Sequence, residues 1–252
     1  DNAIKSYDQA IELQPENYES WYKKGLSFQN IKQYDDAIAA YTKAVELKPD
    51  YTSALYNLGN SLVNLNRYED ALKAYDQVVQ YQSSHYQSWF SRGNILVTLR
   101  RYLQAVDSFK EVIKYNSGNY QAWYSLGWSL HQSQRYVEAI DAYNKAISLK
   151  ENDYQAWYNL GNSQYILQKY EDAITSYNKA VRYKKNHYET WYSRGNALLN
   201  LNRYQEAIES YDQAIKYKPD YQQAIEARRM AENQLQPEKS RPIIVPTLRI
   251  RN

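Results

Sequence analysis

The chain contains no cysteine, so it can form neither a disulfide bond nor a thiolate metal site. No apolar run approaches the roughly 20 residues that a membrane-spanning helix needs, and we expect no membrane contact. There are only 3 histidines and 7 glycines, and no glycine-rich phosphate-binding loop is present. None of the histidines has a second histidine or an acid at metal-ligand spacing. We therefore expect no catalytic residues, no cofactor and no metal.

Charge of neither sign dominates the chain. There are 31 basic residues against 28 acidic ones, and the two kinds are mixed along the whole length. A nucleic-acid-binding protein would concentrate its basic residues on one face. The composition therefore predicts no nucleic-acid partner.

Glycine is scarce, but six of the seven glycines recur at a spacing of 34 residues. They are Gly25, Gly59, Gly93, Gly127, Gly161 and Gly195. A period of this length is typical of helical repeat arrays, in which each repeat contacts mainly its neighbours. Since a glycine inside a helix costs about 1 kcal/mol relative to alanine, its recurrence predicts a point where two helices approach closely.

Two apolar stripes accompany each glycine. The first runs from four residues before the glycine to three after it, as in Trp21, Gly25 and Phe28. The second begins twelve residues after the glycine, as in Ala37, Tyr41 and Ala44. Positions i, i+4 and i+7 lie on one face of a helix. Each repeat is therefore predicted to be a pair of helices.

This pattern resembles the tetratricopeptide repeat, whose signature is W-x2-L-G-x2-Y, then A-x3-F, then A and P. The resemblance covers roughly residues 1–235. The closing proline stands at Pro15, Pro49 and Pro219 and is replaced in the other repeats, where we expect looser turns. The resemblance implies an all-α fold: a right-handed α-solenoid, or superhelix, of helix-turn-helix repeats. It also implies that the first helices line a concave face.

The period divides the chain into segments. Residues 1–17 are predicted to be the second helix of a truncated repeat. The full repeats are 18–51, 52–85, 86–119, 120–153, 154–187 and 188–221. Residues 222–235 are predicted to form a capping helix, because Arg229 stands where the glycine should be. The start of the chain within a repeat favours a longer protein, for which we expect a cytoplasmic location.

A possible binding face follows from two further columns. The residue three before the glycine is aromatic in every repeat, and the residue one after it is mostly asparagine. With two residues of the next turn, the predicted peptide-binding set is Tyr22, Tyr56, Asn60, Phe90, Asn94, Tyr124, Trp128, His131, Tyr158, Asn162, Tyr165, Tyr192 and Asn196. An asparagine side chain can donate and accept, so it can pair with a peptide backbone of any sequence. The alternative interpretation is that both columns only keep the helices packed and soluble.

The central repeats depart from this pattern. Trp128, His131 and Tyr165 replace smaller or polar residues, which predicts an aromatic pocket or, alternatively, space-filling between neighbouring first helices. A related groove of the family binds acidic C-termini through a lysine in the aromatic column. No repeat of this chain carries that lysine. We therefore do not expect a binding site for acidic C-termini.

Loop and turn residues carry two smaller expectations. His85 and His187 lie between repeats, where we expect them to be exposed to solvent. Arginine precedes tyrosine at several turns within repeats, as at Arg67, Arg101 and Arg203. Cation–π packing against that tyrosine is the expected role.

The last segment, residues 236–252, breaks the repeat pattern. Pro237, Pro242 and Pro246 predict an extended tail rather than a helix. We expect residues 241–251 to lie in a concave groove, that of their own molecule or of a neighbouring one. The alternative is a linker without a binding partner.

A protein–protein interaction scaffold is the function that these features favour. Its partner would be a protein or peptide segment held in the concave groove, and the chain itself would not be an enzyme. The alternative is an accessory regulatory domain of a larger signalling enzyme, whose catalytic domain lies outside this chain.

Overall fold

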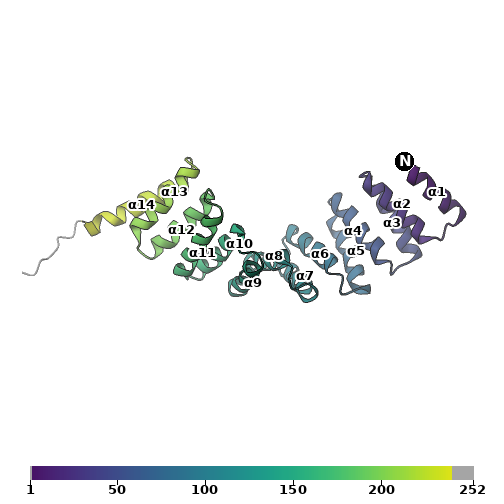
Figure 1. Cartoon of the computed structure of the whole chain (residues 1–252), viewed down its shortest axis with the longest axis horizontal. Helices are drawn as coiled ribbons and strands as arrows, with labels where there is room; N and C mark the ends of the chain where they lie inside the picture. Colours follow the sequence, from purple (N-terminus) through teal and green to yellow (C-terminus); the bar gives the residue numbers. More distant parts are fainter. Residues whose placement is uncertain (1, 240–252) are drawn as a thin grey trace, which may run out of the picture. The chain divides into compact units, whose positions relative to one another are not determined.

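The computed structural model describes residues 2–239 of the 252 in the chain. About 80% of those residues are helical, and none of them lies in a strand. The predicted all-α solenoid is therefore confirmed. The chain divides into two compact units, residues 1–133 and 134–252, and each unit is described by itself (Figure 1).

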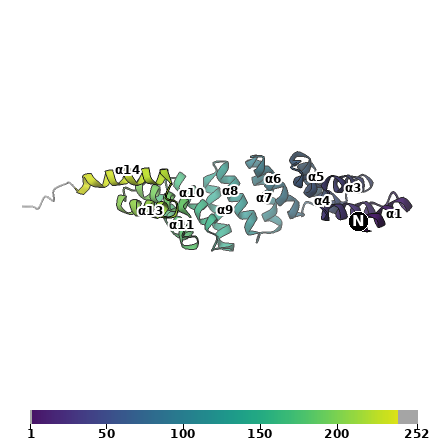
Figure 2. The same ribbon diagram turned by 90° about the horizontal axis from the view of Figure 1, so that it is seen from above.

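Both units are built from helices stacked side by side (Figures 1 and 2). The first unit contains α1 (Asn2–Leu13), α2 (Tyr18–Asn30), α3 (Tyr34–Leu47), α4 (Thr52–Asn64), α5 (Tyr68–Tyr81), α6 (Tyr86–Thr98), α7 (Tyr102–Tyr115) and α8 (Tyr120–Gln132). The second contains α9 (Tyr136–Leu149), α10 (Tyr154–Ile166), α11 (Tyr170–Tyr183), α12 (Tyr188–Asn200), α13 (Tyr204–Tyr217) and α14 (Gln222–Lys239). Within each unit every helix packs against the next one along the chain. Even-numbered helices are the first helices of the hairpins, and α2 also meets α4, as α10 meets α12.

The repeated glycines face buried aromatic rings on the second helices. A Cβ atom added at Gly59 would lie 2.6 Å from the ring of Tyr75, and one at Gly161 would lie 2.5 Å from the ring of Tyr177. Gly25, Gly93 and Gly195 stand in the same relation to Tyr41, Phe109 and Tyr211. Carbon atoms in contact are normally about 3.5–4.0 Å apart. The close approach predicted from the glycines is therefore one between a helix backbone and an aromatic side chain.

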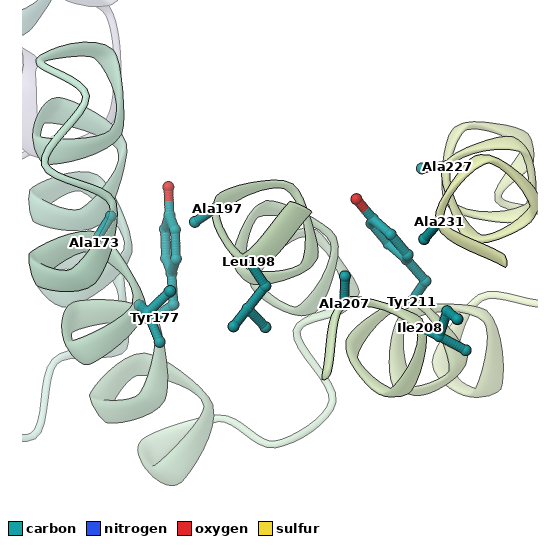
Figure 3. Packing of buried hydrophobic residues seen from close by; sticks show 10 residues of the cluster. Ala173, Tyr177, Ala197, Leu198, Ala207, Ile208, Tyr211, Ala227 and Ala231 are labelled. Atoms are coloured by element: carbon teal, nitrogen blue, oxygen red, sulfur yellow. The ribbon is translucent and has the colours of Figure 1, made fainter. Parts of the chain in front are cut away.

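The opposite side of each ring packs on the following first helix. In the second unit Tyr177 stands beside Ala197 of α12, and Tyr211 stands beside Ala231 of α14 (Figure 3). Both tyrosines are at most 1% exposed, and both alanines are fully buried. The rings thus join each hairpin to the next, which makes the hydrophobic core a continuous row within the unit.

The loop before each first helix is held by tryptophan, proline or both. The indole Nε1 of Trp157 donates to the carbonyl oxygen of Glu151 at 2.7 Å. Trp21, Trp89, Trp123 and Trp191 donate in the same way to Pro15, Ser83, Ser117 and Lys185. The two described first helices without tryptophan, α4 and α14, follow Pro49 and Pro219 instead. The loops without proline have the same length as those with it, and an indole bond holds each of them; whether they are looser stays a prediction.

The turn within each hairpin uses a left-handed residue. Lys32, Asn66, Arg100, Gln134, Gln168 and Asn202 all have φ between 58° and 62°. Asparagine tolerates this conformation, whereas for a residue such as Gln168 the left-handed conformation costs about 1–2 kcal/mol of free energy. The tight turn is therefore imposed by the packing of the two helices rather than by the turn residues themselves.

The last helix, α14, closes the second unit (Figure 2). It packs along α13 through Ala224, Ala227 and Ala231, which are at most 4% exposed. The helix runs to Lys239 and so includes Pro237, which corrects the expectation that an extended tail begins at residue 236. A proline near the end of a helix removes one backbone hydrogen bond, a loss that the preceding turns can sustain. Residues 240–252, with the segment 241–251 predicted to occupy a groove, lie outside the described residues.

Candidate functional site

Two recesses open on the first helices of the first unit, and Asn94 borders both. The polar recess, of about 360 Å³, is lined by Asn60, Val63, Asn64, Tyr68, Tyr75, Ser91, Asn94, Ile95 and Thr98. The aromatic recess, of about 210 Å³, is lined by Asn94, Val97, Tyr124, Ser125 and Trp128. The structure thus brings together four residues of the predicted peptide-binding set. They are Asn60, Asn94, Tyr124 and Trp128.

The aromatic column is half-buried and packs against the second helices. The ring centroids of Tyr56 and Tyr75 are 5.9 Å apart, and those of Tyr56 and His85 are 5.1 Å apart. Tyr22, Phe90, Tyr158 and Tyr192 pack on their own second helices with centroid distances of 5.8–6.2 Å. Tyr124 stacks on Tyr120 at 6.2 Å. These rings therefore have a packing role, and only part of each surface is open to a ligand.

The asparagine column also has partners inside the fold. The hydroxyl of Tyr75 donates to Asn60 Oδ1 at 2.7 Å. The same bond joins Tyr177 to Asn162 at 2.9 Å and Tyr211 to Asn196 at 2.8 Å. In the first hairpin, where Leu26 replaces the asparagine, Gln29 accepts from Tyr41 instead. A buried hydroxyl needs a hydrogen-bond partner, so these asparagines serve the core and retain mainly their Nδ2 donors for a ligand.

Asn94 is the exception in this column. Its hairpin carries Phe109 in place of the tyrosine, so no hydroxyl reaches its amide. The residue is exposed, and within residues 2–239 its side chain makes no hydrogen bond. Asn94 therefore keeps both its donors and its acceptor for a ligand.

Trp128, His131 and Tyr165 each pack within their own unit. The rings of Trp128 and Tyr102 meet edge to face at 5.4 Å in the first unit. His131, also there, is half-buried, and desolvation lowers its pKa. In the second unit Tyr165 packs on Tyr170 at 5.4 Å and accepts from Asn200 Nδ2 at 3.0 Å. The pocket formed by all three residues stays a prediction.

Sequence reasoning missed several polar residues of the recesses. Ser91 and Ser125 stand two residues before the glycine, and Asn64 and Thr98 stand five after it. These columns flank the asparagine column at i−3 and i+4, so they share its helix face. That spacing could have indicated them, but small polar residues are common on helix surfaces, so their presence alone does not indicate a binding residue.

No charged side chain lines either recess. Arg92 Nε lies 2.6 Å from Asp76 Oδ1, and Arg101 Nη2 lies 2.7 Å from Glu69 Oε1. The turn arginines were expected to stack on the tyrosines that follow them. Arg67, Arg101 and Arg203 instead bind carboxylates, since a guanidinium can make two parallel hydrogen bonds to a carboxylate.

The loop histidines are half-buried, contrary to the expectation that they face solvent. His85 Nδ1 accepts from the backbone N–H of Ser88 at 3.2 Å, at the start of α6. The ring of His187 lies 5.0 Å from that of Tyr154 and 5.1 Å from that of Tyr158. Desolvation by this burial lowers the pKa of both histidines.

Residues 2–239 contain no group of three or more histidine, aspartate or glutamate side chains placed to hold a metal ion. No helix over the same residues is long and apolar enough to cross a membrane.

Comparisons with known proteins agree with the architecture. Two family profiles described as tetratricopeptide repeat match the chain, one at residues 56–110 and 92–156, the other at 18–51, 154–187 and 188–221. YrrB, described as a TPR protein with an unusual peptide-binding site, is 26% identical with a TM-score of 0.69, over 75% of this chain and 98% of its own. No curated protein matches the chain.

Two further solved structures, at lower identity, show the fold alone. The C-terminal part of a TPR repeat-containing protein from Cytophaga hutchinsonii has a TM-score of 0.72 at 14% identity, over 89% of this chain and 92% of its own. MamA has a TM-score of 0.60 at 22% identity, over 64% of this chain and 94% of its own.

Proposed function

Because this chain belongs to the tetratricopeptide repeat family, whose members are generally non-catalytic protein-interaction scaffolds, we propose that its first helices bind an extended peptide segment of a partner protein. The observation that carries the proposal is the position of Asn94 between a polar and an aromatic recess in the first unit. YrrB, which is similar over three quarters of this chain, is itself described as having a peptide-binding site.

The chemistry of the two recesses suits a peptide backbone with apolar side chains. An asparagine amide offers two donors and an acceptor, the groups that an extended backbone presents in return. Trp128, Tyr124 and Val97 offer apolar contact to one side chain of the segment. Because no charge lines either recess, binding is expected to change little with salt concentration.

The second unit offers a more restricted surface. Asn162 and Asn196 accept hydrogen bonds from tyrosine hydroxyls, so they can donate to a peptide carbonyl but hardly accept from a peptide N–H. Tyr158 and Tyr192 add partly open aromatic surface beside them. We infer that this unit, taken by itself, offers mainly donors to a peptide backbone.

The test begins with a library of random dodecapeptides displayed on phage and enriched against the whole chain. Synthetic peptides from that selection are then titrated calorimetrically against the wild type and Trp128→Ala. Trp128→Ala is expected to weaken binding at least about tenfold, since truncating a central tryptophan contact commonly costs about 2 kcal/mol or more at such interfaces.

Tyr81→Ala is the matched control, because Tyr81 is a 51% exposed aromatic residue on α5 that lines neither recess. It is expected to leave the affinity unchanged, and circular dichroism should show both variants folded. Enrichment of no peptide, or equal affinity for Trp128→Ala and the wild type, would refute the proposed function.

A further inference from the structure

The hairpin of α6 and α7 is unusual in carrying phenylalanine at both of its facing aromatic positions. The chain uses tyrosine 29 times and phenylalanine only 3 times. Two of those three, Phe90 and Phe109, form the ring pair of this hairpin, with centroids 5.8 Å apart. The equivalent pair of the preceding hairpin is Tyr56 and Tyr75. The hairpin around Asn94 therefore lacks the two hydroxyls that the preceding hairpin has.

In two other hairpins the hydroxyl on the second helix has similar partners. Tyr75 donates to Asn60 Oδ1, and Ser91 of the next first helix approaches the same hydroxyl. Tyr177 has the same relation to Asn162 and Ser193. In these two hairpins the hydroxyl thus lies between an asparagine of its own hairpin and a serine of the next one.

Phe109 leaves this place without a hydroxyl. The residues that would flank it, by the same spacing, are Asn94 and Ser125. Within residues 2–239 neither side chain has a hydrogen-bond partner, and both line the aromatic recess. Phe109 itself is fully buried. One amide and one hydroxyl therefore face the recess beside Trp128 with their hydrogen-bonding capacity unused.

We propose that Phe109 determines specificity by freeing Asn94 and Ser125 to bind the backbone of one residue of the partner segment. The Nδ2 of Asn94 donates to the carbonyl oxygen of that residue, and Oδ1 accepts from its N–H, two groups that point to the same side of an extended chain. The adjoining residue of the segment is apolar and enters the aromatic recess, and it carries no charge because the lining carries none. This inference rests on the proposed function and adds to it the position at which the backbone of the partner segment is bound.

Phe109→Tyr tests the proposal without altering the groove surface. The new hydroxyl would find Asn94 and Ser125 as partners, as that of Tyr75 finds Asn60 and Ser91, so the variant is expected to fold. It would donate to Oδ1 of Asn94, as Tyr75 does to that of Asn60, and so compete with the peptide N–H for this oxygen. The affinity for a synthetic dodecapeptide obtained from the selection is expected to fall about three- to tenfold, the equivalent of one hydrogen bond.

Tyr75→Phe is the matched control, because it removes a hydroxyl from the equivalent site and releases Asn60. It is expected to leave the affinity unchanged or to raise it. Asn94→Ala removes the donor as well as the acceptor, so it should weaken binding at least as much as Phe109→Tyr does, and the two changes together should weaken it no more than Asn94→Ala alone. Because Asn94 is exposed, Asn94→Ala carries the test even if Phe109→Tyr lowers the melting temperature.

The outcomes for these variants distinguish the proposed function from the role of Phe109. If Trp128→Ala abolishes binding but Phe109→Tyr and Asn94→Ala bind like the wild type, the segment sits in the groove and the role of Phe109 is refuted. If Trp128→Ala has no effect, the proposed function fails as well. A loss of affinity in Phe109→Tyr and Asn94→Ala, with none in Tyr75→Phe, supports the inference.

Discussion

Replacing Gly161 by alanine tests the contact on which the stacking of each hairpin depends. The added Cβ would lie 2.5 Å from the ring of Tyr177, about 1 Å inside normal carbon–carbon contact. The ring cannot easily withdraw, because it is 1% exposed and its hydroxyl is bonded to Asn162. Overpacking of a core costs about 1–3 kcal/mol, and an overlap this large belongs near the upper end of that range.

Helix propensity acts in the opposite direction. Alanine stabilises a helix by about 1 kcal/mol relative to glycine. We therefore expect Gly161→Ala to reduce the free energy of unfolding by about 2 kcal/mol, measured by urea denaturation followed with circular dichroism. The sign is the decisive result, because a glycine in an open helix would give a gain of stability.

Two further variants distinguish steric overlap from a general effect of the substitution. Gly118→Ala is the control, since a Cβ there would meet its nearest side-chain atom only at 4.0 Å and should leave stability almost unchanged. Combining Gly161→Ala with Tyr177→Leu should cost less than the sum of the two single changes, because the smaller side chain removes the overlap. If Gly161→Ala is as stable as the wild type, or more stable, the ring contact does not explain the glycine column.

Three other predictions concern the loops between hairpins. Trp157→Phe removes the indole bond to the loop and should lower stability by roughly 0.5–1.5 kcal/mol in the same denaturation assay; no loss would mean that the loop is fixed by other contacts. Ser117→Pro should raise stability by about 0.4–1 kcal/mol. Asn116, which precedes it, has φ −145° and ψ 77°, close to the φ of −137° and ψ of 90° of Lys48, which precedes Pro49. A loss of stability would show that this loop differs from the one that contains Pro49. The lowered pKa values of His85 and His187 mean that the folded state binds fewer protons than the unfolded one. Their contribution to the free energy of unfolding is therefore complete above about pH 6.5 and is lost as the pH falls toward and below the lowered values. The variant with both histidines replaced by asparagine should lose less stability than the wild type between about pH 7 and pH 5, and an identical pH profile would contradict this.

The sequence alone determined the architecture. A glycine every 34 residues, with apolar stripes at helical spacing on either side, predicts paired helices of fixed length. The start of α2 at Tyr18 and of α10 at Tyr154 follows from that period. Arg229 in a glycine position likewise predicted a final helix that covers the preceding hairpin. These features could be read because each rests on spacing within one helix or on repetition along the chain.

Only the tertiary structure decided what the recurring side chains do. The period places Asn60, Asn94 and Asn162 in one column as equivalents, but their hydrogen bonds depend on a residue fifteen positions later, on another helix. A tyrosine there occupies the amide oxygen of Asn60 and Asn162, whereas Phe109 leaves that of Asn94 open. The same holds for the indole of Trp157 and its loop carbonyl. Helical spacing tells which residues share a face, but whether two polar groups meet depends on the reach of side chains across packed helices, which only the fold fixes.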